Sequence, residues 1–348
     1  MNLIKDFAHR GTNSVLLEDN IMIAGTPAAA GSKILEGFNS LITATVVTRL
    51  EKAGFKVAGT ASADQFGLPC LFEDSPPSDA VNAVASGAVE FALANDVFGR
   101  VRAAAVAAGC CYIRPTYGTV SRFGLIPTAT SMDSVGIICR DLSRGYKLLN
   151  AIAGKDEKDG AMYDMESYNY ASPSMNSPIA TLSQFPVNIE GAIKIDLPYA
   201  DLYGEVMYTL ATAELSHNIN RYDGIAFGHR ATDARKLDEL YTKTRATLST
   251  DIKFAAIMGA SFVSGDNYTK LYEQAMKLRG MICDSITFDG YDLIALPCPD
   301  KLSYENLGLF ALPALTGLPC VAMEYQGQQV QVISKNLACS GVFVESDF

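Results

Sequence analysis

Two adjacent cysteines are the first candidates for chemistry in this sequence. Cys110 and Cys111 would supply a nucleophilic thiol if a nearby base or a helix N-terminus lowered the pKa of one of them. The residues that follow run into an apolar segment that ends at Ile113, where no such base is expected. We therefore interpret both thiols as parts of the core rather than as nucleophiles.

Histidines and arginines are the next candidates. His217 and His229 are twelve positions apart, and His9 is remote from both. None of these spacings is typical of a metal site, so neither a metal nor a cofactor is expected. Arg100 and Arg102 stand two positions apart and would bind an anion if both were free. A salt-bridged structural arginine is the favoured interpretation of Arg100.

Charge and composition bear on possible partners. The 348 residues include 28 Lys and Arg against 38 Asp and Glu, a net charge of −10. A protein that holds nucleic acid by itself usually presents a basic face, so direct nucleic-acid binding is not expected. The longest apolar stretch, residues 103–113, has eleven residues and is too short to cross a bilayer. We see no secretory signal, and eight cysteines without C-x-x-C pairs indicate buried thiols of a cytoplasmic protein.

Helix-like and strand-like segments alternate in the N-terminal half. Residues 43–52 place apolar side chains on one face, and Gly54 then stops the helix. Short strands separated by helices of about ten residues predict parallel β–α units and a sheet covered on both faces, which is an α/β fold. The expected strands are 55–58, 89–93 and 111–113, and the further helices are 79–86, 100–108 and 142–153.

The second half contains a break in this pattern. Residues 155–190 are rich in Tyr, Ser, Asn, Met and Pro without a sustained period, which indicates a long flexible surface connection. After it we expect strands at 193–195 and 291–297 and helices at 202–219, 236–245 and 267–284. Because internal repeats are absent, residues 1–348 are expected to form a single domain.

Several segments carry a resemblance to a known family. Residues 114–126 are similar, nearly letter for letter, to the KPTYGRVSRFGL segment of amidotransferase A subunits. Other matching segments follow the same order along the chain: 19–21, 30–35, 44–50, 131–133, 152–156, 220–225 and 314–319. The chain thus resembles the amidase-signature family, and within it the A subunits of glutamyl-tRNA(Gln) and aspartyl-tRNA(Asn) amidotransferases. The resemblance implies a central, mostly parallel twisted sheet with helices on both faces.

The resemblance also locates the Ser–cis-Ser–Lys triad of active members. In such a triad a neutral lysine takes the proton of the nucleophile through the middle serine. In this chain the lysine position holds Glu18, the middle serine position holds Pro76 and the nucleophile position holds Arg100. A guanidinium is permanently protonated and cannot attack a carbonyl. All three triad positions are therefore changed.

The family resemblance bears on three further groups of residues. Phe98 replaces a glycine in the turn that forms the oxyanion hole of the family, beside Gly99, and its ring is expected to fill the space of the substrate. Asp96 and Arg102 match the family, which suits a structural role for this pair. Arg279 matches an arginine that the resemblance implies as a contact for the carboxylate of the substrate, although a solvated helix arginine is the favoured interpretation.

These changes predict a pseudoenzyme, a shortened non-catalytic homologue of the A subunit that acts as a structural or regulatory partner. The expected partner is a B- or C-type subunit of the amidotransferase, or a homologue of one. Two alternatives stay open. One is an enzyme of the amidase or glutamine amidotransferase type with altered catalytic residues, among them Glu18. The other is a small-molecule sensor that uses the former substrate cavity.

Overall fold

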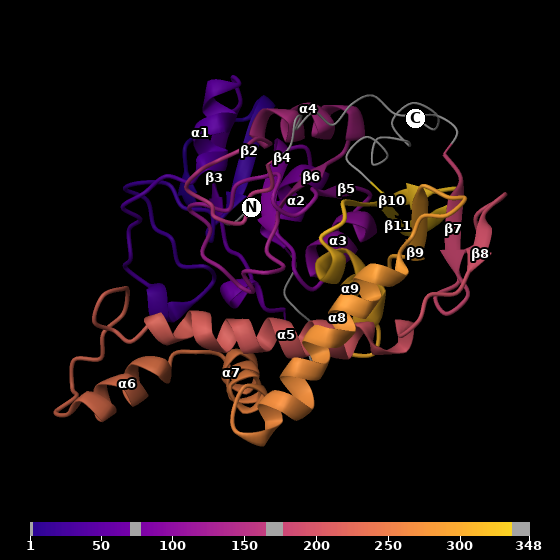
Figure 1. Ribbon diagram of the computed structural model, residues 1–348. Coiled ribbons are helices and arrows are strands. Elements are labelled where there is room, and N and C mark those ends of the chain that lie inside the picture. The colour runs from indigo at the N-terminus through magenta and orange to yellow at the C-terminus, as the bar shows by residue number, and fades with distance from the viewer. Residues whose placement is uncertain (1–2, 70–77, 165–176, 336–348) are drawn as a thin grey trace.

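The computed structural model describes residues 3–69, 78–164 and 177–335. Their strands form an eleven-stranded sheet with the order β1-β3-β2-β4-β6-β5-β10-β11-β9-β7-β8. Figure 1 shows the N-terminal strands at one end of the molecule and β7 and β8 at the other. The strands are β1 (Leu3–Asp6), β2 (Gly11–Glu18), β3 (Lys56–Ala61), β4 (Val89–Asn95), β5 (Cys111–Arg114), β6 (Val135–Cys139), β7 (Ile179–Leu182), β8 (Ile193–Ile195), β9 (Leu293–Pro297), β10 (Cys320–Tyr325) and β11 (Gln328–Ser334).

The sheet is mixed, which corrects the expectation of a mostly parallel one. Six strand pairs are antiparallel and four are parallel. One cause is the hairpin between β10 and β11, in which Gln326 and Gly327 form a two-residue turn with φ values of 49° and 70°. So short a turn joins only antiparallel strands. Another cause is the fully described connection 115–134 between β5 and β6, which contains no crossover helix.

Helices cover both faces of the sheet, as the sequence predicts, so the α/β class is confirmed. On one face α1 (Thr45–Lys52) and α4 (Leu142–Ile152) pack their apolar sides against β2, β4, β5 and β6. On the opposite face α2 (Asp79–Ala85) and α3 (Arg100–Ala107) bury small side chains, mostly Ala and Val, against the same strands. Small side chains let these two helices approach the sheet closely.

A second group of helices forms the largest core cluster. Figure 1 shows α5 as a long helix along one side of the molecule, with α7 and α8 nearby. Their buried side chains pack with those of α9 and with residues of β9 and β11. The members are α5 (Tyr203–Asn218), α7 (Thr250–Phe262), α8 (Glu273–Ser285) and α9 (Leu307–Thr316), with α6 (Leu237–Arg245) beyond them and a π-helix, η5 (Tyr268–Tyr272), between α7 and α8.

Most elements of the N-terminal half lie where the sequence predicts them, within a few residues. The expected helix 267–284 is divided into η5 and α8. The expectation of an unstructured connection at 155–190 is wrong in part, because β7 lies within it and pairs with β8 and β9. Residues 165–176 of that connection lie outside the described residues. Helix α9 was not expected, since it is apolar on all sides and contains Pro313.

None of the helices in the described segments is long and apolar enough to cross a membrane. That residues 1–348 form a single domain stays a prediction.

Candidate functional site

The turn between β4 and α3 is organised by one carboxylate. Asp96 follows the last residue of β4, and its Oδ1 accepts hydrogen bonds from the backbone N–H of Gly99 at 2.9 Å and of Val101 at 3.3 Å. Its Oδ2 accepts from the backbone N–H of Arg102 at 3.1 Å and from Nε of the same residue at 2.9 Å. The carboxylate thus satisfies the free N–H groups at the start of α3 and neutralises a guanidinium that is wholly buried.

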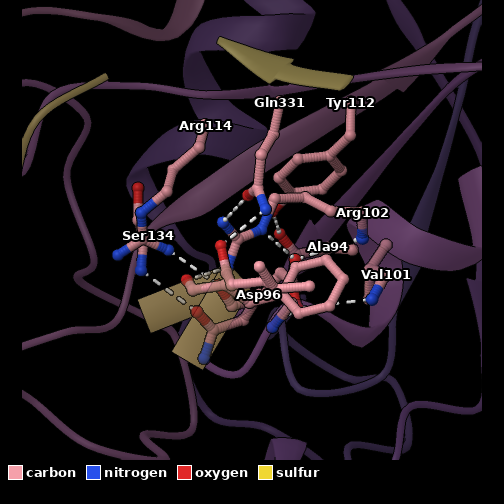
Figure 2. Close-up of polar contacts among 12 residues, drawn as sticks. Ala94, Asp96, Val101, Arg102, Tyr112, Arg114, Ser134 and Gln331 are labelled. Atoms are coloured by element: carbon pink, nitrogen blue, oxygen red, sulfur yellow. Dashed lines mark hydrogen bonds and ion pairs between the residues drawn. The ribbon is translucent and has the colours of Figure 1, made fainter. Parts of the chain in front are cut away.

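The other nitrogens of Arg102 reach distant parts of the chain (Figure 2). Its Nη1 donates to Oε1 of Gln331 on β11 at 3.0 Å, and its Nη2 donates to the carbonyl of Phe310 on α9 at 3.1 Å. The buried Arg114 donates from Nη1 to the carbonyl of Asp96 at 2.7 Å. The pairing of Asp96 with Arg102 that the sequence suggested is confirmed, and it joins β4, α3, α9 and β11.

The residues of the expected oxyanion turn are closely packed. Gly99 has a φ of 101° and precedes α3, and a Cβ atom at this position would lie 2.3 Å from Cδ1 of Phe310. The side chain of Phe98 is 1% exposed and belongs to the large apolar cluster that includes Phe66 and Leu312. The space beside the turn is therefore filled by aromatic side chains of the protein.

Arg100 and Glu18 lie at the same end of the sheet. The guanidinium of Arg100 forms an ion pair with Asp64, with 3.1 Å between Nη1 and Oδ2, and the two side chains are 11% and 15% exposed. Glu18 is the last residue of β2, is 3% exposed, and accepts a hydrogen bond from the backbone N–H of Asn95 at 3.2 Å. Pro76, the third triad position, lies outside the described residues.

Burial sets the protonation of the two carboxyl groups. Desolvation, reinforced by the charge of Asp64 and opposed by Arg100, raises the pKa of Glu18 well above its ordinary value. Desolvation likewise raises the pKa of Asp64 to about 6, although Arg100 opposes the rise. The folded protein therefore holds these protons more tightly than the unfolded chain does. Their contribution to stability is present at low pH and is lost as pH rises through the raised values.

Three neighbouring strands bring these acids together. β2 is parallel to β3 and to β4, so the carboxyl ends of the three strands lie at one edge of the sheet. Glu18 ends β2, Asp64 follows β3 and Asp96 follows β4. The sequence reasoning did not include Asp64, although an acidic residue after each of three parallel strands was the available signal.

Arg279 lies on α8 and is bound by the protein itself. Its Nε donates to the carbonyl of Leu315 at 2.8 Å, and its Nη1 and Nη2 donate to the Oγ and the carbonyl of Ser131 at 2.9 and 3.1 Å. Ser131 also donates from its backbone N–H and its hydroxyl to the carboxylate of Glu214 on α5. The favoured expectation of a freely solvated arginine is not what the structure shows.

The cysteines of the described segments behave as core residues. Cys110 and Cys111 are 2% and 5% exposed. Burial raises the pKa of Cys110 and raises that of Cys111 to about 12, so neither thiol is ionised near neutral pH. All six cysteines in these segments are free thiols, whereas Cys70 and Cys339 lie outside them. Likewise, in residues 3–69, 78–164 and 177–335 no group of three or more His, Cys, Asp or Glu side chains is placed to hold a metal ion.

Comparisons with known proteins agree with this architecture. The model of the amidase family matches residues 14–82 and 80–187. The A subunit of glutamyl-tRNA(Gln) amidotransferase from Lachnoclostridium phytofermentans is 30% identical over 328 residues, which is 81% of this chain and 66% of that protein. The corresponding protein of Lysinibacillus sphaericus is 30% identical over 329 residues, which is 81% of this chain and 67% of the relative. This chain belongs to the amidase family.

Solved structures show the same fold. The crystal structure of the A subunit of glutamyl-tRNA(Gln) amidotransferase from Thermotoga maritima superposes with a TM-score of 0.73 at 23% identity, over 98% of this chain and 86% of the other. A crystal structure described simply as an amidase gives a TM-score of 0.71 at 17% identity, over 95% and 82% of the two chains. At these identities the likeness establishes the architecture alone.

Removing the carboxylate of Asp96 provides a test of the buried network. Asp96→Ala leaves the buried guanidinium of Arg102 without its counter-charge and the first N–H groups of α3 without an acceptor, so we expect a loss of about 3–5 kcal/mol in the free energy of unfolding. Asp266→Ala is the matched control, since its pair with Lys270 is 87% and 69% exposed and should hardly change the denaturation midpoint. Urea denaturation followed by circular dichroism measures both, and equal effects would refute this role for Asp96.

Proposed function

We propose that this chain is a non-catalytic homologue of the amidotransferase A subunit, which keeps the amidase fold in order to act as a structural or regulatory partner. The observation that carries the proposal is the ion pair between Arg100 and Asp64. The family resemblance implies that active members carry their nucleophilic serine at the position of Arg100.

The chemistry of each triad position supports this proposal. Acyl transfer needs a nucleophile with a lone pair and a base within hydrogen-bond reach. A guanidinium has no lone pair to donate, and that of Arg100 is neutralised by Asp64. Glu18, at the lysine position, is buried with a raised pKa. Its carboxyl group already accepts a hydrogen bond from the backbone N–H of Asn95 within the core, so it does not face an open substrate site.

The packing around the Phe98–Arg100 turn also supports the proposed loss of catalysis. An oxyanion hole needs backbone N–H groups that point into open space about 3 Å from the developing charge. Here the backbone N–H of Gly99 already donates to Asp96, and the ring of Phe310 lies against Gly99. Phe98 is buried in the apolar cluster next to it. These contacts leave little room for a substrate carbonyl at the turn.

We also assign a structural role to Arg279. Three of its hydrogen bonds go to Leu315 and Ser131, so the guanidinium joins α8 to the end of α9 and to the loop after β5. A guanidinium has five N–H donors, and these three contacts account for most of them. This makes Arg279 a weak candidate for a substrate carboxylate, which is the role that the family resemblance implies.

The alternative of an enzyme with altered catalytic residues has less support. Glu18 is almost entirely buried, and the thiols of Cys110 and Cys111 have raised pKa values. An altered enzyme would need at least one activated nucleophile, and none of these groups has that character.

Ammonia release tests the loss of catalysis. The purified protein is incubated with glutamine, asparagine and a panel of simple amides, and Glu18→Ala and Arg100→Ala serve as matched variants. We expect the same background rate for all three proteins, because neither side chain can act on an amide. Release by the wild type that either substitution abolishes would overturn the proposal.

The partner role is tested separately. When the chain is isolated from the lysate of its own cells under native conditions, we expect it in a stable complex, and the family resemblance implies that the partner is a B- or C-type subunit. Mass spectrometry of the purified complex would identify such a partner. A protein found strictly as a solitary monomer would contradict a scaffolding function, whatever the result of the ammonia assay.

A further inference from the structure

A large cavity lies away from the triad positions, between α5, α7 and η5. Its volume is about 680 Å³, within the range of sites that bind small molecules. Helix α5 contributes Glu214 and His217 to its wall, and the loop after β5 contributes Thr130. Neither Glu18 nor any residue of the Phe98–Arg100 turn lines it. The cavity is therefore distinct from the ion-paired edge of the sheet.

Two tyrosines from the π-helix form one part of the wall. Tyr268 and Tyr272 both line the cavity, with their ring centroids 5.6 Å apart and their planes inclined by 36°. Such π-helical turns are uncommon and occur frequently at functional sites. Ala260 and Val263 of the neighbouring segment add an apolar surface. The wall thus offers aromatic and aliphatic side chains against which the apolar part of a small ligand can pack.

One carboxylate supplies the charge of the wall. Glu214 accepts two hydrogen bonds from Ser131, which use about half of the lone pairs of the carboxylate. None of the described residues that line the cavity is a lysine or an arginine. The neighbouring guanidinium groups are bound by the protein: that of Arg279 donates to Ser131, that of Arg221 to Asn218 and that of Arg245 to the carbonyl of Asn220.

We propose that this cavity binds a small organic cation, in which an ammonium group is held by Glu214 and the attached apolar body lies against Tyr268 and Tyr272. A carboxylate beside aromatic rings favours an ammonium ion, because the charge attracts it and the ring faces add a cation–π contribution. Asn220 and Ser264, which also line the cavity, supply polar groups for the remaining N–H donors.

A series of three probes of nearly equal shape tests the proposal. Benzylamine carries a positive charge at neutral pH, benzyl alcohol is neutral and benzoate is negative. Ligand-observed NMR titration of the full chain should give saturable binding of benzylamine, with both other probes bound at least about tenfold more weakly. Equal binding of the three probes, or no saturable binding of benzylamine, would overturn the proposal.

Single substitutions test whether benzylamine binds in this cavity. Glu214→Gln keeps the shape and one acceptor oxygen but removes the charge, and it should weaken benzylamine binding by about fivefold or more. Glu205→Gln is the matched control, since Glu205 lies on the same helix but lines a different cavity, and it should change the affinity by less than about twofold. If Glu214→Gln binds benzylamine as tightly as the wild type does, the proposal is wrong.

A second variant covers the case in which Glu214→Gln fails to fold. Tyr268 is 48% exposed, so Tyr268→Ala should leave the thermal unfolding midpoint nearly unchanged. It should nevertheless weaken benzylamine binding by about threefold or more. Unchanged affinity in this variant would likewise refute the assigned site.

Discussion

The burial of the guanidinium of Arg102 is the constraint on which the rest of the structure depends. A buried charge is tolerated only when a counter-charge and hydrogen-bond acceptors surround it. Asp96 supplies the charge, while Gln331 and the carbonyl of Phe310 supply the acceptors. Because these groups come from β4, β11 and α9, satisfying one side chain fixes how the first half of the chain meets the second. The same carboxylate also accepts hydrogen bonds from the first N–H groups of α3 and so fixes the start of that helix, where Arg100 lies.

The ion-paired edge follows from that geometry. With α3 fixed, Arg100 meets Asp64, and Glu18 lies buried at the neighbouring strand end. A centre that hydrolyses amides needs a free nucleophile and space for a carbonyl. In this chain the groups neutralise one another and aromatic rings fill the adjoining space. A fold alone does not establish a chemistry, so function has to be argued from the side chains of the site.

Sequence reasoning reached the strand–helix alternation of the first half because apolar periodicity and helix-stopping glycines are local signals. It also paired Asp96 with Arg102, which are six positions apart. It did not find the partners of Arg279, because two of its acceptors belong to Ser131, 148 positions away. Nor did it find α9, whose sides are all apolar. The mixed character of the sheet depends on which strands become neighbours, and periodicity carries no information about that order.

The edge of the sheet at which Glu18, Asp64 and Arg100 lie is a closed cluster of ion-paired and buried groups. The protonation of Glu18 reports on this directly, since an open site would hydrate its carboxyl group. The measurement is a pH titration by NMR of protein labelled with ¹³C at the glutamate side-chain carboxyl, with Glu18→Gln used to assign the signal. We expect Glu18 to titrate well above the ordinary glutamate pKa. Titration near the ordinary value of about 4.3 would show a hydrated carboxylate, and the cluster would then not be closed.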